Sequence, residues 1–334
     1  MINGADTAFV LAAAGLVLLM TPGLALFYAG MVRSKNVLGT MMQSLVLISL
    51  ISLEWVYLGY SMSFGPDVAG FIGDLSWVGL KGVGNAPSAT YATTIPHMVF
   101  MIYQCMFAVI TPALIAGAFA ERVRFPAFVV FSLLWALLVY NPVCHWVWGS
   151  GGWLAKLGVV DFAGGLVVHA TCGAAALASV MVIGPRKGYG QTNFMPHNLP
   201  MTVLGAGLLW FGWFGFNGGS ALAANETAGT AFVATHLGGM AGMAMWTVME
   251  WIKLGKPTTL GAVSGAVAGL ATITPAAGFV GPNAAIVIGL IAGIVCYLAV
   301  NMKSKFKFDD SLDVVGIHGV GGITGALSLG VFAD

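Results

Sequence analysis

Long apolar stretches alternate with short polar ones along this chain of 334 residues. A helix needs about 20 apolar residues to cross the hydrocarbon core of a bilayer, so each such stretch predicts a membrane-spanning helix. The pattern predicts ten of them, at residues 7–32, 37–64, 96–119, 125–148, 162–184, 198–222, 228–252, 259–276, 283–302 and 312–332. The connection at 65–95 is rich in Gly, Pro, Ser and Asp, which predicts a long loop outside the lipid. The predicted fold class is therefore all-α integral membrane.

The composition supports this prediction. Hydrophobic residues make up 58% of the chain and charged residues 7%, whereas a soluble domain carries roughly 25% charged residues. The net charge of +1, without a basic stripe, excludes a nucleic acid as partner. The four cysteines are widely spaced in or beside apolar runs, so we expect small buried hydrophobic residues rather than a metal or redox motif. Since the first basic residue is Arg33, we expect no cleaved signal peptide.

Lysine and arginine predict the orientation of the chain. Loops after the odd-numbered helices hold eleven of the 13 basic residues, and loops after the even-numbered helices hold only Lys81 and Lys156. Because basic loops stay in the cytoplasm, we expect the loops after the odd-numbered helices on the cytoplasmic side of the cell membrane and the N-terminus on the outside. The eleven residues are Arg33, Lys35, Arg122, Arg124, Arg186, Lys187, Lys253, Lys256, Lys303, Lys305 and Lys307.

Three short motifs recur in the second half of the chain in the same order. They are "ITPA" at 110–113 and 273–276, "GLALFYAG" at 23–30 with "GWFGFNGG" at 212–219, and "DFAGGLVVHATCG" at 161–173 with "DVVGIHGVGGITG" at 313–325. Each match is displaced by five predicted helices, so equivalent helices cross the membrane in opposite directions. The chain therefore predicts two inverted five-helix repeats, approximately 1–190 and 191–334, with a site near the midplane between them.

Two histidines lie at related positions of this repeat. His169 follows Asp161 by eight residues, and His318 follows Asp313 by five. With a rise of about 1.5 Å per residue, the two rings enter the membrane from opposite sides and can meet near the middle. Ionisable groups inside a membrane are costly and usually functional, and burial away from carboxylates disfavours imidazolium. We therefore expect a neutral pair that shares a proton and offers a donor and an acceptor to a polar molecule.

With these residues, the sequence resembles the ammonium transporter family (Amt/Mep/Rh). The resemblance covers nearly the whole chain in order, through "TPGLALFYAGMVRSKN" (21–36), "QCMFAVITPALIAGAFAER" (104–122), "HWVWGSGGWL" (145–154), "DFAGGLVVH" (161–169), "WFGWFGFNGGSA" (210–221), "ITPAAGFVGP" (273–282) and "DDSLDVVGIHGVGGITGAL" (309–327). It implies a homotrimer in the lipid bilayer with one narrow pore per subunit, which passes ammonium or ammonia and is not an enzyme. The family has eleven spans, of which ten are counted here. The resemblance also implies a cytoplasmic PII-type regulator and no cofactor.

The resemblance assigns an outer cation site to Trp148, Phe107 and Ser220, with Asp161 as a structural carboxylate that supports it. These residue types fit ammonium, because attraction between a cation and an aromatic face is worth about 0.5–2 kcal/mol. A carboxylate in contact with the cation would bind it more tightly and slow its release. Interfacial Trp and pore Phe are also common packing residues, and packing explains them better without the resemblance.

Below that site, Phe107 and Phe216 resemble two stacked rings that close the pore, and His169 and His318 resemble the family's twin histidines. Among the other histidines, at 97, 145, 197 and 236, we expect a structural hydrogen bond for His236. For Glu54, the carboxylate in "SLEWVYLGY", we expect an internal partner such as a backbone amide or hydroxyl, with a proton route as the alternative.

Two other functions compete with transport. The same pore can serve as an ammonium-sensing module of a longer signalling protein with little flux. A membrane enzyme with His169 and His318 as metal ligands is the second alternative, but catalytic zinc takes three protein ligands. No H-x-x-x-H motif or nearby acid supplies the third ligand, so we expect no metal site.

The distribution of basic residues generates a test of orientation. A single cysteine placed at Lys305, in a background free of other cysteines, is expected to react with an impermeant thiol reagent only from the cytoplasmic side, because that loop belongs to the basic set. Labelling of intact cells against inside-out vesicles measures this. Labelling from outside the cell would reverse the predicted orientation.

Overall fold

The computed structural model describes residues 1–333, and helices form all ten predicted membrane-spanning segments. Five segments are single helices: α1 (Gly4–Met31), α4 (His97–Ala116), α10 (Glu226–Leu254), α11 (Thr259–Ile273) and α12 (Pro282–Phe306). The other five are built from consecutive pieces: α2 (Val37–Glu54), η2 (Trp55–Gly59) and α3 (Tyr60–Phe64); α5 (Phe125–Trp135), η4 (Ala136–Tyr140) and α6 (Asn141–Trp148); η5 (Gly165–Ala170) and α8 (Thr171–Ile183); α9 (Leu199–Gly218) and η6 (Gly219–Ala221); η7 (Val315–Val320) and α13 (Gly321–Phe332). The predicted all-α membrane fold is confirmed.

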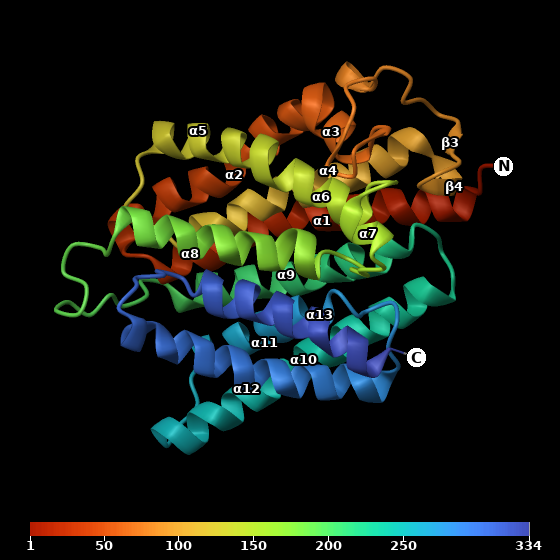
Figure 1. The fold of residues 1–334 in the computed structure, drawn as a ribbon. Helices are drawn as coiled ribbons and strands as arrows, with labels where there is room; N and C mark the ends of the chain where they lie inside the picture. Colours follow the sequence, from red (N-terminus) through yellow and green to blue (C-terminus); the bar gives the residue numbers. More distant parts are fainter. Residues whose placement is uncertain (334) are drawn as a thin grey trace.

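The helices run lengthwise beside one another, with both chain ends at one end of the bundle and the loop between α8 and α9 at the other (Figure 1). Within residues 1–333, eight helical segments are long and apolar enough to cross a membrane. Of the other two predicted segments, α11 has 15 residues, and α10 carries buried glycines such as Gly238 and Gly242 that pack against α11 and α12.

The predicted outer loop at 65–95 contains two small antiparallel hairpins at the end of the bundle that holds both termini (Figure 1). The pattern did not predict these strands, because pieces of two to five residues carry too little alternation to detect. The strands are β1 (Asp67–Val68), β2 (Ile72–Gly73), β3 (Pro87–Ser88) and β4 (Ala92–Pro96). The remaining short helices are η1 (Ser34–Asn36), η3 (Val78–Leu80) and α7 (Trp153–Lys156).

Four of the pieces in the described chain are π-helical turns: η2, η4, η5 and η7. A π-turn inserts one extra residue into a helix and often lies at a functional site. His169 lies in η5 and His318 lies in η7, so both candidate pore histidines project from this unusual backbone.

The first segments of the two halves, α1 and α9, pack tightly in opposite directions. Gly23 of α1 faces the backbone near Leu209 of α9. Gly30, seven residues later on α1, faces Thr202, seven residues earlier on α9. Since residue numbers rise along one helix as they fall along the other, the pair is antiparallel. Glycine at the contact lets the two backbones approach closely, which is how membrane helices gain packing energy.

The last segments of the two halves cross in the same way. A Cβ atom on Gly173 of α8 would overlap the backbone of Gly319 in η7, and a Cβ atom on Gly322 of α13 would overlap the backbone at Ala170 in η5. The two contacts are reciprocal, as a two-fold relation between antiparallel helices requires. This arrangement agrees with the inverted direction that the sequence motifs predicted.

The register of the predicted repeat is corrected by the structure. The carboxylate equivalent to Asp161 is Asp310 rather than Asp313, because Asp310 precedes His318 by eight residues, as Asp161 precedes His169. The Asp310 carboxylate accepts a hydrogen bond of 2.8 Å from the Val315 backbone at the start of η7. The comparison of the two motifs paired Asp161 with Asp313, the first residue of "DVVGIH", which lies three residues after the equivalent Asp310.

An ion-pair network joins the two halves at the end opposite the chain termini. The backbone and guanidinium of Arg186 donate hydrogen bonds of 2.7–2.9 Å to the carboxylate of Asp309, and Arg122 lies 3.7 Å from it. Burial raises the pKa of Asp309, but the hydrogen bonds from Arg186 outweigh that effect and keep the pKa below its ordinary value. Asp309 is thus held as a carboxylate directly before Asp310, which caps η7.

The glycine crossing generates a test of packing. Gly173→Ala is expected to lower the stability of the protein by about 1–3 kcal/mol, because the added methyl group enters the backbone of Gly319. The matched control is Gly330→Ala on α13, whose added methyl group meets nothing within 4 Å. Thermal unfolding in detergent measures both. Equal unfolding temperatures for the two variants would contradict the close crossing.

Candidate functional site

A hollow beside the β3–β4 hairpin brings the predicted outer residues together, and we call it the outer vestibule after the side on which it is predicted to lie. Its volume is about 400 Å3, and its lining includes Gln104, Phe107, Trp148, Asp161, Ser220 and Thr227. The Trp148 ring meets Phe107 edge-on, with centroids 5.9 Å apart and planes at 89°. The Ser220 hydroxyl lies at the rim, 3.2 Å from the Tyr103 hydroxyl.

The floor of the outer vestibule is a pair of phenyl rings. The centroids of Phe107 and Phe216 are 4.3 Å apart, and both side chains are 1% exposed. Two hydroxyl groups of α4 contact the backbone at the ring residues: the Tyr103 hydroxyl lies 2.8 Å from the Phe216 carbonyl, and the Thr111 hydroxyl donates to the Phe107 carbonyl at 2.6 Å. The two rings therefore lie between the outer vestibule, which Phe107 lines, and the small cavity at the histidines, which Phe216 lines.

Below the floor lie the two histidines. The Nδ1 atoms of His169 and His318 are 3.2 Å apart, and the rings are nearly parallel at 20°. One of these nitrogens must donate and the other accept, so one proton lies between the two Nδ1 atoms. The His169 ring also stacks on Phe216, at 6.0 Å, and on Trp213, whose Nε1 is held by the Thr274 hydroxyl at 2.9 Å.

The space around the histidines is narrow and apolar. A cavity of about 10 Å3 is lined by both histidines and by apolar side chains such as Leu24, Leu114 and Val168. A cavity of about 10–15 Å3 holds one water-sized molecule. This cavity therefore has room for one molecule the size of water and no room for a hydrated ion. The His169 Nε2 atom is buried there without a hydrogen-bond partner.

Asp161 lies against the outer vestibule, but its oxygens are committed to the backbone. They accept four hydrogen bonds of 2.7–3.0 Å from the amides of residues 164–167, at the start of η5. The neighbouring Asp161 carbonyl accepts from Trp148 Nε1 at 2.8 Å. The carboxylate therefore orients η5, which carries His169, and the backbone of the same residue orients Trp148.

The structure also brings in residues that the sequence interpretation did not name. Tyr103 holds Ser220 and the backbone of Phe216, and the Gln104 side-chain oxygen is buried in the vestibule lining without a partner. Helical spacing was the available signal, because Gln104 precedes Phe107 by nearly one turn in "QCMF".

Glu54, His97 and His236 lie outside this line of rings and have different surroundings. Glu54 accepts a hydrogen bond of 2.7 Å from the Asn141 side chain, so its partner is a side-chain amide rather than a backbone amide or hydroxyl. His97 lies 2.5 Å from the Tyr60 hydroxyl. His236 packs against the rings of Trp210 and Phe214, and the structural hydrogen bond expected for it is not found among residues 1–333.

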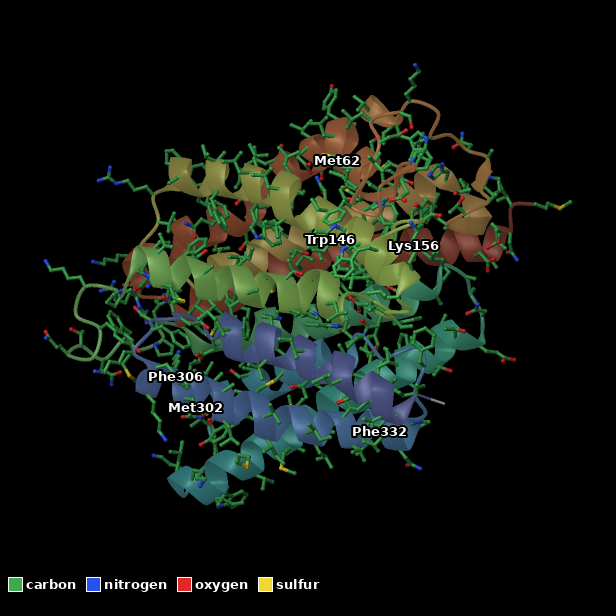
Figure 2. The ribbon with its side chains drawn as sticks, in the orientation of Figure 1. Met62, Trp146, Lys156, Met302, Phe306 and Phe332 are labelled. Carbon is green, nitrogen blue, oxygen red and sulfur yellow. The ribbon has the colours of Figure 1, made fainter. Side chains whose placement is uncertain are left out.

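Other hollows do not include the predicted residues. A larger cavity of about 540 Å3 lies between α8 and α12 and is lined by Met181, Met302 and Phe306, the last two labelled in Figure 2. Within residues 1–333, no three side chains of His, Cys, Asp or Glu come together as a metal site. The four cysteines are buried and unpaired, as predicted.

The chain forms ten helical segments around a line of aromatic and histidine rings, and equivalent helices of its two halves run in opposite directions. These features define a multi-pass membrane protein with inverted halves. Residues 8–334 match the model of a family described as "Ammonium Transporter Family". The chain belongs to this family, which confirms the resemblance found in the motifs.

Named relatives support the same assignment. An ammonium transporter of Bacillus subtilis is 56% identical over 98% of this chain and 80% of its own length. Ammonium transporter Amt1 of Archaeoglobus fulgidus is 51% identical over 98% of this chain and 81% of its own.

Solved structures agree with the fold. Mep2 of Saccharomyces cerevisiae has a TM-score of 0.93 at 40% identity, over 100% of this chain and 77% of its own. A protein described as "Sensor Amt Protein" has a TM-score of 0.92 at 31% identity, over 99% of this chain and 83% of its own.

Proposed function

We propose that this chain passes ammonium across the membrane as ammonia plus a separately moved proton. The observation that carries the proposal is the unbroken series of rings from Trp148 through Phe107 and Phe216 to the paired histidines, in which neighbouring centroids are 4.3–6.0 Å apart. The names of the relatives, ammonium transporters at about half identity, support ammonium as the substrate.

Recruitment takes place at the outer vestibule. Trp148 and Phe107 offer aromatic faces, and the Ser220 hydroxyl offers an oxygen, so the cation gains attraction without a fixed negative charge. Asp161 supports the site through its backbone contacts and does not touch the cation, because its four hydrogen bonds already use both oxygens. A cation held this way is bound weakly enough to move on.

Selectivity arises at the phenyl floor and the narrow passage. Potassium keeps its charge, so a dry passage of about 10 Å3 rejects it. Ammonium can transfer its proton to the unpartnered Nε2 atom of His169, next to the floor, and continue as ammonia. The unmet hydrogen bonds of ammonia would cost roughly 1–3 kcal/mol in a purely apolar pore. His169 and His318 supply those bonds, and their line of nitrogens offers a route for the proton.

The family setting leads to further proposals about assembly and location. We propose one pore per subunit of a homotrimer in the cell membrane, with the N-terminus outside and repeats of approximately 1–190 and 191–334. A PII-type protein is the proposed regulator at the cytoplasmic face, where the basic loops are predicted to lie, with exposed residues such as Lys253 and Lys256.

Sensing is the second candidate function. A protein described as "Sensor Amt Protein" has a similar fold over 99% of this chain, and this likeness supports sensing as an alternative function. A sensor needs the outer site to bind ammonium but needs no flux, so transport through purified protein separates the two functions.

The outer site generates one prediction. Trp148→Leu with Ser220→Ala is expected to weaken selection for ammonium over methylammonium by about 1–2 kcal/mol, through loss of the cation–π attraction. Competition constants in proteoliposomes measure it. Trp251→Leu, an exposed tryptophan on α10, is the matched control. Unchanged constants in the double variant would remove these residues from the site.

The histidine pair generates another prediction. His169→Asp or His318→Asp is expected to admit potassium, because an ionised carboxylate holds a cation in the passage, and the double His→Ala variant is expected to lose proton-coupled ammonium current. His236→Ala, on the exposed side of α10, serves as control. Full ammonium current and continued rejection of potassium in the double variant would make the pair structural.

A further inference from the structure

His145 lies outside the line of rings, yet both of its nitrogens have partners. The ring is buried in α6, three residues before Trp148. Its Nδ1 lies 2.9 Å from the carbonyl oxygen of Ser63, and its Nε2 lies 3.0 Å from Oδ1 of Asp67 in β1. Neither contact belongs to the transport path proposed above.

The chemistry of these partners determines where the protons are. A carbonyl oxygen can only accept, so Nδ1 carries a hydrogen. Asp67 also accepts from the Gly70 amide at 2.8 Å and from the Lys156 ammonium group at 3.3 Å, which is the environment of an ionised carboxylate. Nε2 must then donate as well, whereas a neutral imidazole has only one N–H.

We infer that His145 is an imidazolium paired with Asp67, and that this ion pair positions the turn that presents Trp148 to the outer vestibule. The inference rests on the proposed role of Trp148 and adds a positioning pair to it. The hydrogen bond from His145 lowers the pKa of Asp67 below its ordinary value, as pairing with a cation requires.

The pair is packed against the turn that follows Trp148. A Cβ atom on Gly149 would overlap the His145 ring, and a Cβ atom on Gly151, which has φ +97°, would overlap the Asp67 side chain. A displaced ring or carboxylate would therefore shift the backbone next to Trp148.

The same outer loop is tied to this turn by two further hydrogen bonds. The Trp146 Nε1 donates to the Phe71 carbonyl at 2.8 Å, and the Trp153 amide donates to the Gly70 carbonyl at 3.0 Å. Figure 2 labels Trp146 on α6 and Lys156 on α7, which carry two of the contacts to the loop. The ion pair is thus the charged part of a clamp between the loop and the outer end of α6.

Few other groups around the clamp can titrate. Lys156 is 60% exposed, so its pair with Asp67 contributes little. Burial raises the pKa of Tyr91, whose hydroxyl lies near Asp67, to about 12. The Cys144 thiol is next to His145 on α6, and the Asp161 carboxylate lies near that thiol. A neutral His145 with its hydrogen on Nδ1 would turn the Nε2 lone pair toward the Asp67 carboxylate 3.0 Å away, and the clamp would lose its charged part.

The direct test is the protonation state of His145. Protein labelled with 15N-histidine in lipid nanodiscs is expected to give an imidazolium signal at about pH 7.5, where an unperturbed histidine is mostly neutral. The signal should vanish in Asp67→Asn and in His145→Gln, and it should persist in Lys156→Gln, which removes only the exposed partner. Absence of an imidazolium signal from wild-type protein at this pH would overturn the inference.

The positioning role needs its own measurement. With the ammonium ion concentration held constant at each pH, Asp67→Asn is expected to weaken the competition constant at the outer site about fivefold, the scale of one partly exposed ion pair. The wild-type constant should weaken toward the same value as pH rises, and Asp67→Asn should lose this pH dependence. An unchanged constant in Asp67→Asn, with the imidazolium signal gone, would refute positioning. An unchanged constant in Trp148→Leu would refute the outer site instead and leave the imidazolium result standing.

Discussion

The pairing of His169 with His318 depends on how closely two helix backbones can cross. Gly173 and Gly322 leave no side chain at the crossing, so η5 and η7 approach until the histidine Nδ1 atoms are 3.2 Å apart. A side chain at either glycine would enter the opposing backbone, and the rings would separate. The carboxylates of Asp161 and Asp310 then orient the two π-helical turns from which the rings project.

The same constraint explains why the halves are inverted. Antiparallel crossing brings a histidine from each side of the membrane to the same depth, with the apolar walls of both halves around it. In the proposed mechanism, this geometry supplies a donor and an acceptor inside a passage that is otherwise dry, so a neutral polar molecule crosses where an ion cannot.

Much of the fold could be predicted from the sequence, because membrane helices are encoded by length and hydropathy alone. All ten segments and the meeting of the two histidines were predicted, since each depends on counting residues along a regular helix. The register of the second repeat was not predicted correctly. The π-turns, and the role of Asp310 rather than Asp313 as the capping carboxylate, depend on backbone contacts that leave no periodic pattern in the sequence. Tyr103 was missed for a similar reason: it holds Ser220 and the Phe216 backbone across a separation of more than 110 residues. His145 looked like an unremarkable residue near a helix end, and only its two acceptors distinguish it.

The central claim, that the chain conducts ammonium as ammonia and a proton, is tested most directly by simultaneous recording of current and ammonium uptake in proteoliposomes. An ammonium gradient is expected to drive uptake and an inward current together, whereas a potassium gradient of equal size is expected to drive neither. Binding of ammonium without uptake above protein-free liposomes would contradict transport and favour sensing. A potassium current of similar size would contradict the dry passage at the paired histidines.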